Sequence, residues 1–123
     1  MKVSERQRLN VFEMRCLRSM AGVSRMDIVR NEVVRQRTDV NGTLANRVDR
    51  SVLRWLGHME RMDDERLVKR VMKARVSGRN TRGRPSLGWM NGVRNALNDR
   101  GIGVEEAKVR ARDKNEWRAL VNL

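Results

Sequence analysis

Leu44–Met62 reads LANRVDRSVLRWLGHMERM, and this stretch decides the fold. Its apolar residues recur at spacings of three and four: Leu44, Val48, Val52, Trp55, Met59 and Met62. This spacing predicts a helix with one apolar face, which Leu56 widens, and with charged residues such as Asp49, Glu60 and Arg54 on the outside. Gly57 is about 1 kcal/mol less favourable than Ala inside a helix, so we expect it to permit the close approach of another helix.

The residues before this stretch predict shorter helices. Ser4 can cap a first helix that extends to Met20 and has its apolar positions at Leu9, Phe12, Cys16 and Met20. Gly22 can take the left-handed conformation that ends a helix. Ser24 and Asp27 have the spacing of a capping box for a second helix, with apolar positions at Met26, Val29 and Val33. Asn31 can divide that helix in two, and residues 38–43 are typical of a turn.

Asp63 or Asp64 can cap a helix immediately after the central stretch. We expect its inward positions to be Leu67, Val68, Val71 and Met72, and its outward positions to be Arg66, Lys69, Arg70 and Lys73. Both faces follow from helical periodicity alone.

The C-terminal part predicts three further helical segments. Pro85-Ser86 can start a helix that carries Trp89, Val93, Ala96 and Leu97 and ends at Gly101 and Gly103. A short helix is expected over 105–111, and Asp113 with Glu116 forms a second capping box before Trp117, Leu120 and Val121. We interpret the three tryptophans as core anchors. The sequence thus predicts an all-α domain of about five to seven helices, with helical regions 1–74 and 89–123 joined by an exposed basic linker, 75–88.

The positive charge is unevenly distributed. The chain has a formal net charge of +13, but residues 66–98 contain nine Lys or Arg and no Asp or Glu. Such a block suits a polyanion, either RNA, DNA or an anionic membrane, although a face that is merely solvated is the alternative. No apolar run approaches the roughly 18 residues of a membrane span, so we expect a soluble intracellular protein.

Within this block, residues 75–89 read RVSGRNTRGRPSLGW and are too polar and glycine-rich for a core. We predict non-sequence-specific contacts to the phosphates of RNA or DNA in this region. The candidate residues are Arg75, Arg79, Arg82 and Arg84, flanked by Lys69, Arg70, Lys73 and Arg94. Arg82–Pro85 also spells the core of an AT-hook, but there is one copy and Ser86-Leu87 follows it, so phosphate binding is favoured over minor-groove readout.

The sequence predicts no catalytic or metal site and no cofactor. Asp63-Asp64 could suggest two-metal catalysis, but the pair lies where helix capping is expected. His58 and Cys16, each the only residue of its type, cannot supply a zinc site between them. We expect Cys16 to be a small core residue, and His58 to pack at a helix interface, with base stacking as the alternative.

Several stretches in order resemble one family. They are RLNVFEMRCL (8–17), VRNE (29–32), LRWLGHMERM (53–62), RGRP (82–85) followed by Trp89, and DKNEWR (113–118). This set is similar to the C-terminal region of the endonuclease–reverse transcriptase polyproteins of non-LTR retrotransposons, over about residues 7–121.

The resemblance implies a nuclear protein from an element that copies RNA into DNA. No palm aspartates or endonuclease residues of the family match positions here, so we expect no enzymatic activity from this chain. It implies instead an accessory region that holds RNA or DNA next to the polymerase. The alternatives are a helical scaffold that docks against the polymerase without touching nucleic acid, and a decayed fragment without function.

Overall fold

The computed structural model describes residues 3–74, 82–83 and 88–122. In these residues the chain forms seven α-helices and one short 3₁₀ helix, and no strand. The helices are α1 (Val3–Met20), η1 (Arg25–Asp27), α2 (Asn31–Arg37), α3 (Leu44–Glu60), α4 (Leu67–Lys73), α5 (Trp89–Asn98), α6 (Val104–Arg110) and α7 (Lys114–Asn122). The all-α prediction is confirmed. Most of the predicted basic linker lies outside the described residues.

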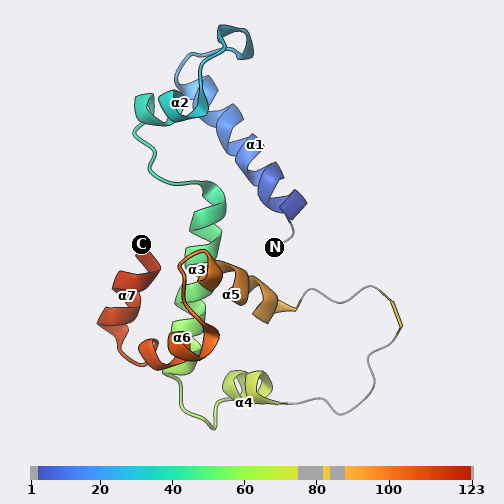
Figure 1. Ribbon diagram of the computed structural model, residues 1–123, viewed down its shortest axis with the longest axis vertical. Coiled ribbons are helices and arrows are strands. Elements are labelled where there is room, and N and C mark those ends of the chain that lie inside the picture. The colour runs from blue at the N-terminus through green and yellow to red at the C-terminus, as the bar shows by residue number, and fades with distance from the viewer. Residues whose placement is uncertain (1–2, 75–81, 84–87, 123) are drawn as a thin grey trace. The chain divides into compact units, whose positions relative to one another are not determined.

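The chain divides into two compact units, Met1–Val48 and Asp49–Leu123, which we call the N-terminal and C-terminal units. The boundary falls inside α3, and the division of one domain into helical regions 1–74 and 89–123 stays a prediction. Each unit has its own group of buried apolar residues. Figure 1 shows the helices that form each unit.

The core of the N-terminal unit is small and differs from the predicted one. Met14 and Leu17 of α1 are buried against Val34 of α2. The predicted inward residues Phe12 and Met20 are instead 61% and 74% exposed. Cys16 is exposed as well, so its assignment to the core is wrong. The same applies to Met26 and Val33 of the second predicted helix, which are both exposed.

The helix ends of the N-terminal unit agree better with prediction. Gly22 has a φ of +65°, as expected for a helix stop. Ser24 and Asp27 form the predicted capping box, in which Asp27 accepts from the Ser24 N–H at 2.7 Å. The second helix is divided, as predicted, into η1 and α2. Ser4 lies inside α1 and does not precede it.

The helix α3 begins at Leu44 as predicted and provides the central element of the C-terminal unit. Its buried residues there are Leu53, Leu56 and Met59, which pack against residues of α5, α6 and α7. Trp55 is 45% exposed, so the prediction that it anchors the core is wrong. Asp49, expected outside, is buried. The buried stripe is rotated from the predicted one toward Leu53 and Leu56.

A close contact between α3 and α7 fixes the C-terminal unit. Trp117 is buried, and its indole Nε1–H donates to the Leu53 carbonyl at 2.9 Å. The ring lies directly over Gly57, where an added Cβ would overlap it. The helix approach predicted from Gly57 is therefore confirmed, and Trp117 is the anchor that requires it. Of the other two predicted anchors, Trp89 is also partly exposed, at 39%.

The helix α4 differs from the prediction in its N-cap and in which of its residues are buried. Its N-cap is Arg66 with no side-chain cap, so capping by Asp63 or Asp64 is wrong. Leu67, Val68 and Val71 are exposed, and Met72 packs against the core cluster. Helix α4 therefore depends on few apolar contacts.

The last three helices complete the C-terminal unit. Helix α5 begins at Trp89 after the N-cap Gly88, and Pro85-Ser86 lies outside the described residues. Gly101 has a φ of +67° after the end of α5, in agreement with its predicted role. Asp113 caps α7 by accepting from the N–H groups of Asn115 and Glu116 at 2.7 and 3.0 Å. No helix in the described part of the chain is long and apolar enough to span a membrane.

Candidate nucleic-acid interface

The four arginines predicted as central phosphate contacts are mostly outside the described residues. Arg75, Arg79 and Arg84 fall in the gaps at 75–81 and 84–87. Arg82 is described and exposed. Their contacts with phosphates remain predictions from sequence.

The flanking candidates differ in availability. Lys69 was expected to point outward, but its side chain is only 13% exposed. Its Nζ donates to the carbonyls of Glu60 and Met62 at 2.9 and 2.7 Å and pairs with Asp64 at 3.0 Å. An ammonium has three donors, so these partners occupy all of them. Lys69 thus closes the C-terminal end of α3 and has no donor left for a phosphate.

The remaining flanking residues are all exposed. Lys73 pairs with Asp64 at 2.8 Å. Arg94 donates to the side-chain oxygen of Asn91 at 3.2 Å. Arg70 is exposed on α4, as are the apolar residues Leu67, Val68 and Val71. Exposed hydrogen bonds and ion pairs of this kind are weak, so Arg70, Lys73 and Arg94 can still turn toward an anion.

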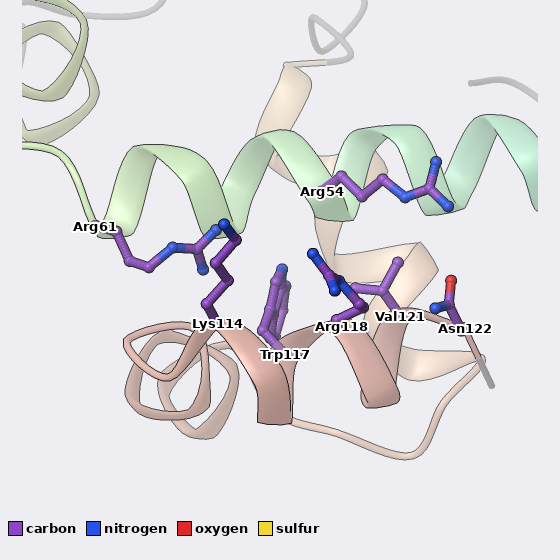
Figure 2. A pocket seen from close by; sticks show the side chains of 7 residues that line it. All are labelled: Arg54, Arg61, Lys114, Trp117, Arg118, Val121 and Asn122. Carbon is purple, nitrogen blue, oxygen red and sulfur yellow. The ribbon is translucent and has the colours of Figure 1, made fainter.

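The structure also reveals a cationic site that the sequence did not predict. A cavity of 310 Å³ lies between α3 and α7 in the C-terminal unit. Its lining residues are Arg54, Arg61, Lys114, Trp117, Arg118, Val121 and Asn122. Four of these seven are cations and none is acidic. We call this cavity the α3–α7 groove (Figure 2).

The groove follows from the antiparallel packing of the two helices. Arg61, just after α3, donates to the carbonyl of Ala111, just before α7, at 2.6 Å. At the other end Arg50 donates to the Asn122 carbonyl at 3.4 Å. Figure 2 shows Arg61 and Lys114 at one end of the groove and Arg54 toward the other, with Trp117 between them. The groove exists because Gly57 leaves room for the Trp117 ring, which holds the helices close.

Within the described residues, the cations of the groove form no ion pairs with acidic side chains. Arg54, Lys114 and Arg118 are exposed and make no ion pair with an acidic side chain of the described residues. The nearby Glu116 lies instead 3.6 Å from Arg110. Like charges held together by packing repel one another, so a bound anion would relieve this repulsion. The groove therefore has the electrostatics of a polyanion site.

A second hollow, of 720 Å³, lies in the N-terminal unit and is lined by the acidic Glu32 as well as by Arg15, Arg18, Arg25 and Arg35. Of its arginines, Arg35 pairs with Glu13 at 2.8 Å, and Arg18 donates to the Val29 carbonyl at 2.6 Å. The hydrogen bond from Arg35 holds the pKa of Glu13 below its usual value. Arg35 links α2 to α1, and Arg18 links α1 to Val29, which precedes α2. The role of these two arginines is therefore structural.

The side chains of His58 and Asp64 were considered above as candidates for catalysis or metal binding. His58 is exposed, not packed at a helix interface as expected, and its ring lies 5.5 Å from that of Trp55. Asp64 binds two lysines, which lower its pKa to about 2, Lys73 having the larger effect and Lys69 the next. Within the described residues, no three His, Cys, Asp or Glu side chains cluster closely enough to hold a metal ion.

A sequence signal for the groove existed but was weak. Arg54 and Arg61 are seven apart, and Lys114 and Arg118 are four apart, so each pair shares one side of its helix. The charge count along the sequence obscured these cations, because both segments also contain acidic residues. Only the pairing of α3 with α7 brings the four cations together.

Comparisons of the chain with protein-family models, curated proteins and solved structures found no match. Any proposal about function therefore rests on the chemistry of the α3–α7 groove and of the basic block, residues 66–98.

Proposed function

We propose that the chain binds RNA or DNA through the phosphate backbone, without sequence specificity, as an accessory region of a non-LTR retrotransposon reverse transcriptase. The observation that carries the binding proposal is the α3–α7 groove, whose described lining contains four cations and no acidic side chain. Guanidinium and ammonium groups are the usual phosphate ligands of proteins. The retroelement context comes from the sequence resemblance alone.

A nucleic acid suits these features better than a small anion. The groove is open and runs along two helices, so successive phosphates of a chain can occupy it. The basic block 66–98 and the net charge of +13 add long-range attraction for a polyanion. Arg75, Arg79, Arg82 and Arg84 would add further phosphate contacts, as the sequence predicts.

The test is the salt dependence of binding to a labelled DNA duplex, measured by fluorescence anisotropy. Each phosphate contact contributes about −0.9 to the slope of log K against log salt. The double variant Arg54→Gln, Arg118→Gln should therefore flatten the slope by roughly 2. Arg30→Gln, Arg37→Gln is the matched control, since it removes two exposed arginines of the N-terminal unit and no groove residue.

The control should leave the slope nearly unchanged. If both double variants weaken binding equally, net charge is responsible and the groove is not a site. No binding by the unsubstituted chain at low salt would contradict the proposed function itself.

A second function, docking against the polymerase, is favoured by one observation in the N-terminal unit. Phe12 and Met20 are exposed on one side of α1 with the exposed Cys16 between them, although soluble domains rarely expose contiguous apolar surface. Such a face suits an apolar partner surface, and the polymerase portion of the element is the candidate. This function does not require nucleic-acid contact.

A further inference from the structure

An exposed aromatic pair lies on α3, outside the lining of the groove. Trp55 is 45% exposed, and its ring lies 5.5 Å from that of His58, with 45° between the planes. Burying an aromatic side chain contributes about 1.5–3 kcal/mol to folding, and Trp55 forgoes much of this. In a chain with only four Phe, Trp and Tyr residues, this exposed indole is available to a ligand.

The pair adjoins the cations of the groove. His58 is four residues after Arg54 and three before Arg61, so helical periodicity places it on their side of α3. Trp55 follows Arg54 directly and contacts His58 one turn on. All of these residues belong to the C-terminal unit. Phosphate-binding groups and aromatic rings are thus within a turn of one another on a single helix.

The surroundings of Trp55 distinguish it from the apolar face of α1. Its exposed neighbours on α3 are Ser51, Arg54 and His58, all polar or charged. A lone indole among such residues offers little to an apolar protein surface. A nucleobase suits it better, because bases stack on aromatic rings while cations hold the adjoining phosphates.

We propose that Trp55 and His58 form a stacking platform for an unpaired base of single-stranded RNA or DNA whose phosphates lie in the α3–α7 groove. This inference rests on the proposed function. A duplex keeps its bases inside and can use only the groove, whereas a single strand can use both the groove and the platform. The chain should therefore bind a single strand more tightly than phosphate contacts alone would allow.

The first test compares two labelled single strands of equal length and charge, one with bases and one fully abasic, using the unsubstituted chain. Stacking contributes enough per base that the abasic strand should bind about 5- to 100-fold more weakly. Equal affinity would overturn the platform and leave phosphate binding intact. Failure of both strands to bind at low salt would instead contradict the proposed function.

The second test locates the platform. Trp55→Leu should lower single-strand affinity by the same factor, change duplex affinity less than twofold, and remove part of the tryptophan fluorescence quenching by the strand. Trp89→Leu is the matched control, since Trp89 is similarly exposed, at 39%, but lies on α5. Equal losses on single strand and duplex, or a selective loss with Trp89→Leu, would show that Trp55 is not the platform.

Discussion

At the scale of single residues, Gly57 and Trp117 determine how α3 and α7 pack. The indole occupies the space of the missing side chain and donates to the Leu53 carbonyl. A buried Trp N–H needs such an acceptor, so ring position and hydrogen bond support each other. The glycine in the sequence predicted a close approach, but nothing local to it identified Trp117 as the partner.

Gly57→Ala should lower the free energy of unfolding by about 1–3 kcal/mol, because overpacking outweighs the gain in helix propensity. Urea denaturation followed by circular dichroism would measure this loss. Gly103→Ser is the control, since an added Cβ there meets nothing and serine is favoured at an N-cap. A Gly57→Ala variant as stable as the parent would contradict the proposed packing.

The wrong prediction of the buried face of α1 can also be traced to single residues. Phe12, Cys16 and Met20 have helical spacing, but so do the buried Met14 and Leu17 with the half-buried Ala21. Periodicity predicts a helix from either set. Which face is buried depends on Val34, which the chain brings from another helix. Sequence could predict this helix and not its orientation.

At the scale of elements, the connection between α3 and α4 is held by polar contacts. Lys69 closes α3 through the carbonyls of Glu60 and Met62, and Asp64 holds both Lys69 and Lys73. The helix α4 has little apolar burial of its own. The exposed ion pairs of Asp64 therefore make a modest contribution to holding α4 in place, beside the packing of Met72.

Asp64→Asn should slightly destabilise the chain above pH 4, and the difference from the parent should shrink as the pH falls toward 2. The two lysines hold the pKa of Asp64 at about 2 in the folded state, below its ordinary value of 3.8. A lowered pKa adds stability that is fully present above the unfolded value and is lost as the pH falls through the folded one. The measurement is urea unfolding of parent and variant between pH 2 and pH 5.

Asp63→Asn provides the control, since Asp63 forms no ion pair within the described residues. The free energy of unfolding of Asp63→Asn should depend on pH in the same way as that of the parent. A constant difference between Asp64→Asn and the parent at every pH would mean that the contribution of Asp64 is not ionic.

Helix positions were largely predictable, because Gly22, Gly101 and the Ser24 and Asp113 caps act locally. The start of α4 was not. Asp63 and Asp64 had the right residue type for a cap, but Asp64 pairs with two lysine side chains of α4 instead of with its first backbone N–H groups. Competition from these lysines overrides the capping preference.

At the scale of the whole molecule, charge and apolar exposure favour different partners. Counting charges along the sequence emphasised residues 66–98, whereas the folded C-terminal unit gathers cations from α3 and α7. The N-terminal unit exposes apolar residues on α1. Sequence could predict an excess of positive charge; it could not predict the groove, which depends on tertiary packing.

If the α1 face docks against a polymerase, the isolated chain should self-associate through it. Sedimentation velocity should show larger species at high concentration, and Phe12→Ser with Met20→Ser should restore the monomer. Val109→Ser removes an equally exposed residue from α6 and serves as the control. A chain that stays monomeric at all concentrations would argue against docking.

The exposed thiol of Cys16 has a practical consequence. It is the only cysteine and lies in the N-terminal unit, while Trp55, Trp89 and Trp117 all lie in the C-terminal unit. A dye attached to Cys16 would leave the buried apolar cluster undisturbed and accept energy from the tryptophans without any substitution. Resonance energy transfer would then report on the separation of the two units when a nucleic acid is added.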